Sequence, residues 1–236
     1  MNENLRHALA EFIGTFAFVF IGCGSVVMAG NALGSPLNGG LVAVALAHGL
    51  ALAVIVSITG HISGGHINPA VTAGLWVTGR IETAKAAMYW AAQLMGALLG
   101  ALALRAVVPG RLADAVALGT PSVDRGAGMG AGAAVVLEAI LTFFLVFTVY
   151  GTAVDPKGAF GKLAGLPIGL ALTVGILAGG PLTGAALNPA RWLGPAVVSG
   201  TWADWWIWVV GPLAGGVIAG FVCWGAFLKG RDGASG

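Results

Sequence analysis

The chain has 236 residues, of which 58% are hydrophobic and only 8% are charged, with a formal net charge of +2. Soluble domains carry about 25% charged residues, so this composition excludes a soluble protein and indicates the lipid bilayer as the main solvent. The small net charge gives no reason to expect a nucleic-acid partner. Cys23 and Cys223 lie in apolar segments without the spacing of metal ligands, so no metal site and no cofactor are predicted.

Six long apolar segments are predicted to cross the membrane. In chain order they cover residues 8–30, 40–60, 84–107, 131–153, 163–179 and 203–228. Each is near the roughly 20 residues that a membrane-spanning helix requires. The first segment follows a weakly charged N-terminus and is long enough to span, so it is predicted to be a transmembrane helix rather than a cleaved signal.

Two shorter apolar segments, 69–79 and 189–199, each begin at an Asn-Pro-Ala triplet. They are too short to cross a bilayer, and a proline in the first turn indicates the start of a helix. We therefore predict two half-helices that enter the membrane and end part-way. The non-helical chain beside them is tolerated at that depth only inside protein or beside a water-filled cavity.

The two halves of the chain repeat each other. Asn68-Pro-Ala recurs as Asn188-Pro-Ala, and Glu11 has a counterpart in Glu138. Glycines four residues apart recur in the same way, as Gly96, Gly100, Gly216 and Gly220. Three spans in each half force the second half to lie inverted in the membrane, a plan known from membrane transport proteins. We expect one channel domain over 1–236, with inverted repeats at about 5–110 and 130–228.

The distribution of Lys and Arg predicts the orientation, because basic residues are enriched in cytoplasmic loops. With a cytoplasmic N-terminus, the basic residues on the inside are Arg6, Arg80, Lys85, Lys157, Lys162, Lys229 and Arg231. Those on the outside are Arg105, Arg111 and Arg125. Both termini are therefore expected in the cytoplasm. The chain shows no targeting extension, which favours the plasma or inner membrane of a prokaryote.

The strongest motif signal comes from the flanks of the two Asn-Pro-Ala triplets. The first reads HISGGHINPAV over residues 61–71, and the second reads GGPLTGAALNPAR over residues 179–191. Two such triplets at equivalent places of an inverted repeat are highly specific. Over about residues 5–228 the chain resembles the aquaporin family. The resemblance implies an all-α membrane fold with six transmembrane helices and two re-entrant half-helices, a pore for water, and a homotetramer.

Asn68 and Asn188 are the candidate residues of the pore midplane. Two half-helices that meet at their N-termini direct their positive dipole ends to the membrane centre. A water molecule there would accept hydrogen bonds from both side-chain amides and could not accept from its neighbour, which would disrupt a proton wire. The positive field would also repel cations. The alternative is that both asparagines only cap their helices.

The extended chain before each half-helix is expected to present carbonyl oxygens to the pore. Glycine and alanine suit this position because the backbone itself must reach the lumen. The residues that match the pore-lining carbonyls of the family are Gly64, Gly65, His66, Gly184, Ala185 and Ala186.

Arg191 follows the second triplet and is the only charged residue between Lys162 and Asp204. An intramembrane Arg usually marks a pathway, although it could also extend to the interface. The resemblance implies a selectivity filter of His48, Ile176, Ala185 and Arg191. This set resembles that of plant tonoplast intrinsic proteins, which implies water together with ammonia, urea or hydrogen peroxide as solutes.

Other functions have weaker support. Glycerol-conducting relatives usually carry Asp after the Arg and a basic residue four positions later, whereas this chain has Trp192 and Ala196. A secondary transporter shares inverted repeats but would need paired charges at a substrate site. An enzyme is not expected, because no nucleophile and base occur at a suitable spacing.

Glu11 and Glu138 are predicted to lie inside the membrane, where a carboxylate is a functional candidate by default. Their symmetry favours a structural role, in which they accept hydrogen bonds from the backbone of the two re-entrant segments, over a proton relay. His61 and His66 are placed in the cytoplasmic half of the pore and lack a third ligand for a metal.

Overall fold

The computed structural model describes residues 1–32 and 40–229, with side chains described for 1–30 and 40–229. Six helices in this part of the chain are long and apolar enough to cross a membrane, so the predicted fold class is confirmed. They are α1 (Glu3–Ala32), α2 (Gly40–Ser63), α4 (Thr83–Val107), α6 (Ala131–Val149) continued by η2 (Tyr150–Val154), α7 (Gly165–Thr183) preceded by η3 (Gly161–Leu163), and α9 (Ile207–Val222) continued by η4 (Cys223–Leu228).

Three helix ends differ most from the prediction. The first helix begins at Glu3 rather than near residue 8, because its polar first turn extends beyond the apolar run. The fifth helix continues through Pro181 to Thr183, where Gly184 ends it with a left-handed backbone of φ 77°. The last helix begins at Ile207 and not at 203, since Asp204 has a positive φ of 55° that a helix does not allow.

The two short segments are the half-helices α3 (Pro69–Val77) and α8 (Pro189–Ser199). Each has proline at its first position and an asparagine as N-cap, as the sequence predicts. The side chain of Asn68 accepts from the Ala70 amide at 2.8 Å, and that of Asn188 accepts from the Ala190 amide at 3.0 Å. The chain therefore starts a helix at each triplet because both the cap and the proline favour it.

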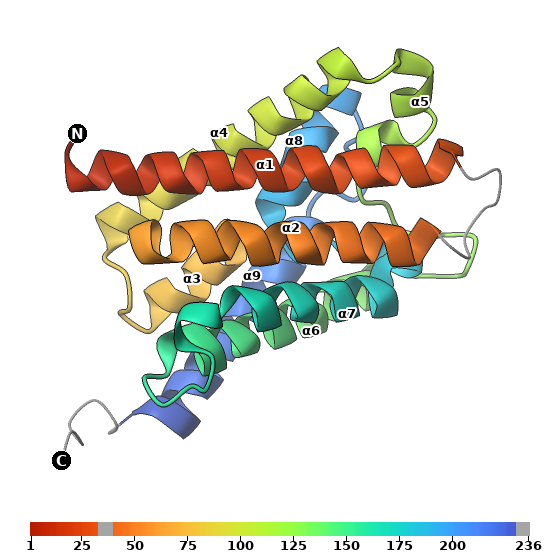
Figure 1. The fold of residues 1–236 in the computed structure, drawn as a ribbon. Helices are drawn as coiled ribbons and strands as arrows, with labels where there is room; N and C mark the ends of the chain where they lie inside the picture. The colour runs from red at the N-terminus through yellow and green to blue at the C-terminus, as the bar shows by residue number, and fades with distance from the viewer. Residues whose placement is uncertain (33–39, 230–236) are drawn as a thin grey trace.

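The helices pack in two related groups. In one, α1 lies against α4 and α2, and in the other, α6 lies against α9 and α7. Figure 1 shows the start of α1 and the end of η4 at the same end of the bundle, which we call the terminal end. The opposite end carries two short elements that the sequence did not predict, α5 (Gly110–Asp114) and η1 (Ala117–Gly119), and we call it the α5 end.

The outer faces of the bundle are apolar. On α2, Leu50, Val54 and Ile58 recur at helical spacing and are 53%, 60% and 58% exposed. A soluble protein would place polar groups on such a face, so these side chains fit contact with lipid or with other subunits. Arg231, which the sequence analysis placed in the cytoplasm, lies outside the described residues.

Glycines allow the helices of the bundle to approach one another closely. A Cβ atom on Gly216 of α9 would lie 2.4 Å from the Ala70 carbonyl oxygen of α3. On Gly100 of α4 it would lie 2.5 Å from the Phe16 carbonyl oxygen of α1. These are contacts of small residues that hold membrane helices together within one chain.

We expect Gly216→Ala to lower the stability of the folded channel by about 1–3 kcal/mol, because the new methyl group overlaps the backbone of α3. Thermal unfolding in detergent measures this as a lower midpoint. Gly132→Ala is the matched control, since a Cβ atom there meets nothing within 4 Å. Equal midpoints for the two variants would contradict the close packing of α3 against α9.

Candidate functional site

The N-termini of α3 and α8 meet inside the bundle through their capping asparagines. Asn68 Nδ2 donates to the Leu187 carbonyl at 2.8 Å, and Asn188 Nδ2 donates to the Ile67 carbonyl at 3.0 Å. Each amide thus binds the residue that precedes the other asparagine. Each Nδ2 carries a second hydrogen that this exchange leaves for another acceptor.

Ile67 and Leu187 hold a backbone conformation that is rare for residues with side chains. Their φ angles are 55° and 51°, in the left-handed region that costs on the order of 1–3 kcal/mol for such a residue. This conformation turns both carbonyls toward the facing asparagine while the preceding amides point away from it. Those amides then need acceptors inside the bundle.

Two buried carboxylates supply the acceptors. Glu11 accepts from the amides of His66 at 2.9 Å and Ile67 at 2.7 Å. Glu138 accepts from the amides of Ala186 at 3.0 Å and Leu187 at 2.9 Å. Both glutamates have no exposed surface. Each carboxylate thus satisfies two backbone amides of one re-entrant segment.

Two hydroxyl groups complete these carboxylate networks and were missed from the sequence. Ser63 Oγ donates to Glu11 at 2.7 Å and accepts from the Gly65 amide at 3.1 Å. Thr183 Oγ1 donates to Glu138 at 2.7 Å and accepts from the Ala185 amide at 3.2 Å. A signal was available, because each hydroxyl residue lies at the same spacing before its Asn-Pro-Ala triplet.

A narrow cavity lies beside the meeting point of the half-helices. Its volume, about 20 Å³ open to the centre of a water molecule, is enough to hold one. Gly65, His66, Asn68 and Asn188 line it together with apolar side chains such as Phe18. The structure therefore brings both asparagines and two of the predicted carbonyl residues to the lining of a water-sized space.

A wider cavity of about 850 Å³ opens at the α5 end. His48, Ile176, Gly184 and Arg191 line it, so three of the four predicted filter residues share one space. Ala185, the fourth, is not among the lining residues of either cavity, although its neighbour Gly184 is. Gly64 and Ala186 also line neither cavity in the part of the chain that the structure describes.

Arg191 lies inside the protein, with only 3% of its surface exposed. Its Nη1 atom donates to the Gly119 carbonyl of η1 at 2.8 Å. This contact crosses from the second half-helix to the segment between α4 and α6. The sequence analysis missed Gly119, since nothing in the sequence indicates which carbonyl of that segment reaches Arg191.

The ring of His48 has a defined orientation. Its Nδ1 atom lies 2.9 Å from the Val44 carbonyl, which can only accept, so Nδ1 carries a proton and, in the neutral imidazole, Nε2 is an acceptor. Nε2 is buried and has no hydrogen-bond partner among the described residues. A Cβ atom on Gly22 would lie 2.5 Å from Nε2, so the glycine in α1 makes room for this ring.

His66 belongs to a polar network that the second half lacks. Its Nδ1 atom lies 3.0 Å from Thr72 Oγ1, which also accepts from Gln93 Nε2 at 3.0 Å. Gln93 Nε2 donates to Glu11 as well, at 2.8 Å. Gln93 and Thr72 were not predicted, because single polar residues in apolar helices give no pattern. His61 is exposed and lies apart from this network.

Residues 1–223 match the sequence model described as Major intrinsic protein. The chain belongs to the major intrinsic protein family. It is 50% identical to "Aquaporin TIP4-4" of Zea mays over 226 residues, covering 95% of this chain and 87% of that relative. It is 46% identical to "Aquaporin TIP2-1" of Arabidopsis thaliana over 231 residues, covering 95% and 88%. These relatives come from plants and give no support to the expected prokaryotic source.

A solved structure of the same family has a similar fold. The X-ray structure of the aquaglyceroporin from Plasmodium falciparum superimposes with a TM-score of 0.83 at 27% identity. The match covers 93% of this chain and 95% of that one. The six spanning helices and two half-helices described above are therefore those of an aquaporin-family channel.

In this family member, we expect Glu138→Gln to destabilise the fold. The carboxylate accepts from three donors, which are the Thr183 hydroxyl and the amides of Ala186 and Leu187. A glutamine has one acceptor oxygen and one amide donor in its place, so at least one of these hydrogen bonds is lost. Hydrogen bonds to charged groups contribute roughly 1.5–3 kcal/mol each. Thermal unfolding in detergent should show a lower midpoint, while the exposed Glu82→Gln serves as control. Normal folding with no transport would instead favour a proton relay.

Proposed function

We propose that this chain is a passive transmembrane channel for water that excludes protons and ions. The observation that carries the proposal is the meeting of two half-helix N-termini at a cavity large enough for one water molecule. Relatives that this chain matches over most of their length are named aquaporins. Aquaporins are channels and not enzymes. The chain is accordingly a channel and not an enzyme.

Proton exclusion follows from the donors at the midplane. A water molecule beside Asn68 and Asn188 accepts from both second amide hydrogens, so its oxygen has no lone pair for a neighbouring water. The chain of hydrogen bonds that protons use is interrupted there. The positive ends of α3 and α8 add a field that repels hydronium and metal cations.

In this proposal, the pore-lining carbonyls and the selectivity filter act on the same single row of water molecules. The carbonyls of Gly64, Gly65, His66, Gly184, Ala185 and Ala186 accept hydrogen bonds from passing water. At the α5 end, Arg191 offers donors and repels cations. Glu11 and Glu138 hold the two re-entrant segments in place.

We propose that at least one small neutral solute, namely ammonia, urea or hydrogen peroxide, also passes the filter of His48, Ile176, Ala185 and Arg191. The filter holds a free acceptor at His48 Nε2 and donors on Arg191, and these solutes carry both donors and acceptors. Ile176 is apolar, so its side chain forms no hydrogen bond with the solute. The two plant relatives described above carry the designation TIP, that of the tonoplast intrinsic proteins, which supports the same solute range.

Glycerol conduction is the second candidate, because the structurally similar protein is titled an aquaglyceroporin. Trp192 opposes it in this chain. The side chain of Trp192 is 2% exposed and stacks on Trp208 at 5.8 Å between ring centroids. The position after Arg191 is thus filled by a packed aromatic pair and not by the Asp of glycerol-conducting relatives.

We further propose a multi-pass protein with both termini in the cytoplasm, in the cell membrane. The described basic residues of the terminal end outnumber those of the α5 end, as the positive-inside rule requires. We also propose inverted repeats at about 5–110 and 130–228 and a homotetramer, which would cover part of the apolar outer faces of α1, α2, α6 and α7. Native mass spectrometry of the detergent-solubilised protein tests the tetramer.

Stopped-flow light scattering of reconstituted vesicles tests the channel. We expect rapid shrinkage in a sucrose gradient with weak temperature dependence, because water crosses without a large conformational change. In a urea gradient we expect shrinkage followed by re-swelling at a rate above that of empty vesicles. A glycerol gradient run in parallel tests glycerol conduction, which would show as re-swelling faster than that of empty vesicles.

Three outcomes would change the proposal. Shrinkage no faster than in empty vesicles would refute a water channel. Strong temperature dependence with saturation would favour a carrier. Urea, ammonia and peroxide permeabilities all at the background of empty vesicles would leave a channel for water alone.

A further inference from the structure

The turn that holds Arg191 has an unusual backbone. Ala117, Leu118 and Gly119 have successive φ angles of 46°, 53° and 74°, all in the left-handed region. Two of the three carry side chains, for which this region is rare. Such a backbone persists only where its surroundings impose it, and it is common at functional sites. The carbonyl of Gly119, the last of the three, is the acceptor for Arg191.

The turn is held from two sides. Leu118 is 2% exposed and belongs to the hydrophobic core. A Cβ atom on Gly119 would lie 3.1 Å from both Cα and the carbonyl oxygen of Cys23 in α1, so the backbone of the turn lies directly on that helix. Packing against α1 therefore limits how the turn can move toward the core.

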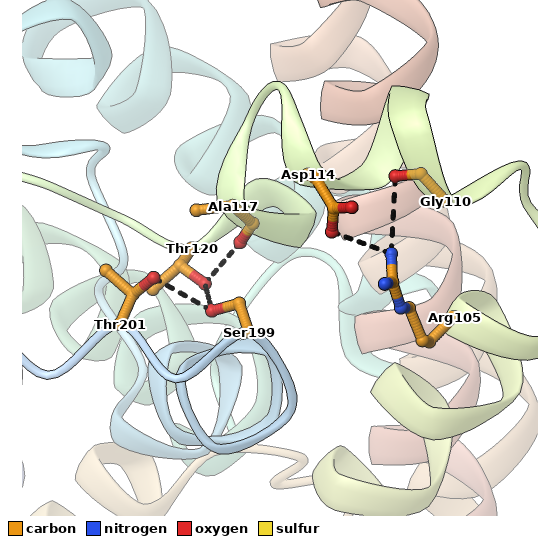
Figure 2. Close-up of polar contacts among 7 residues, drawn as sticks. All are labelled: Arg105, Gly110, Asp114, Ala117, Thr120, Ser199 and Thr201. Carbon is orange, nitrogen blue, oxygen red and sulfur yellow. Dashed lines mark hydrogen bonds and ion pairs between the residues drawn. The ribbon is translucent and has the colours of Figure 1, made fainter.

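Thr120 closes the turn with its hydroxyl group. Its Oγ1 atom donates to the Ala117 carbonyl at 2.6 Å and lies 3.1 Å from Ser199 Oγ. Figure 2 shows these contacts and the further one from Ser199 to Thr201, at 3.0 Å. Because the single proton of Thr120 goes to Ala117, Thr120 accepts from Ser199, whose single proton is shared between Thr120 and Thr201.

Ser199 is the last residue of α8, and Arg191 lies in the first turn of the same half-helix. The segment around the turn thus binds α8 at two points. Gly119 binds the side chain of Arg191, and the next residue, Thr120, binds the far end of the helix. This double attachment fixes the distance between the Gly119 carbonyl and the helix that carries Arg191.

A nearby ion pair joins other elements of the α5 end. Arg105 Nη1 donates to Asp114 Oδ1 at 2.8 Å and to the Gly110 carbonyl at 3.3 Å (Figure 2). The two side chains of this ion pair are 40% and 69% exposed, and exposed ion pairs contribute little to stability. It joins α4 to α5 and does not contact the turn itself.

We propose that Thr120, paired with Ser199, is a positioning residue of the selectivity filter. It holds the Gly119 carbonyl where Arg191 binds it, and so limits the size of solute that passes the guanidinium group. The inference rests on the proposed channel function. Without the Thr120 hydroxyl, the turn relaxes from its left-handed backbone, the carbonyl withdraws, and the guanidinium group swings out of the path.

The test compares Thr120→Val with Thr120→Ser in reconstituted vesicles. Water, urea and glycerol permeabilities are measured on the same preparations by stopped-flow light scattering. We expect the urea-to-water ratio of Thr120→Val to rise about fivefold, the order of one lost hydrogen bond, with a similar rise for glycerol. Thr120→Ser keeps the hydroxyl and should retain the wild-type ratio.

Thr148→Val is the matched control for the loss of a threonine hydroxyl. Thr148 is partly exposed on α6, and its Oγ1 atom donates within its own helix, to the Phe144 carbonyl at 2.9 Å. The control should keep the wild-type ratio. Ser199→Ala is a second route to the same effect and should raise the ratio in the same direction, which keeps the test decisive if Thr120→Val does not fold.

A double variant shows whether the effect runs through Arg191. Arg191→Val should itself raise the urea-to-water ratio, and adding Thr120→Val should then change it no further, because coupled residues are not additive. Independent multiplication of the two effects would overturn the proposal. So would wild-type ratios in folded Thr120→Val and Ser199→Ala.

The experiments distinguish a failure of the proposed channel function from a failure of the proposed role of Thr120. A wild-type protein that passes no water overturns the channel function and this inference with it. A wild-type protein that conducts water, with variants that keep its urea-to-water ratio, overturns only the role of Thr120.

Discussion

The fold depends on placing two non-helical chain segments inside the bundle, where their buried backbone amides need acceptors from the protein itself. Glu11 and Glu138 meet this constraint, each by accepting two backbone amides and a hydroxyl group. Without such acceptors each amide would cost several kcal/mol in a lipid environment. A carboxylate is suited to the task because its two oxygens accept several donors at once.

The geometry of the pore follows from this attachment. With the amides bound to the glutamates, the carbonyls of Ile67 and Leu187 point the other way and accept from the asparagine of the opposite half-helix. The two half-helices are thereby joined end to end, and their caps lie beside a cavity with room for one water molecule. One set of hydrogen bonds thus builds the fold and positions the asparagines that line the narrow cavity.

Much of this arrangement can be predicted from the sequence because it rests on local signals. Apolar length gives the six spans, and Asn-Pro-Ala gives the starts of α3 and α8. The turn at Gly119 and the room that Gly22 leaves for His48 could not be predicted, since both depend on contacts between segments far apart in the chain. The extension of α7 through Pro181 was also missed, because a proline near a helix end is compatible with either continuation or termination.

The two halves share their centre but differ toward the ends of the bundle. Near the first triplet, Thr72 joins His66 and Gln93 in a polar network, whereas at the equivalent place near the second triplet Trp192 stacks on Trp208. Repeat symmetry therefore sets the meeting point of the half-helices, and departures from symmetry give each end its own chemistry. Among the residues that the structure describes, a buried arginine held by a separate turn of the chain is found at the α5 end alone. In the proposed channel, the positions that distinguish one solute from another are thus those where the repeat breaks down, and η1 belongs to that region.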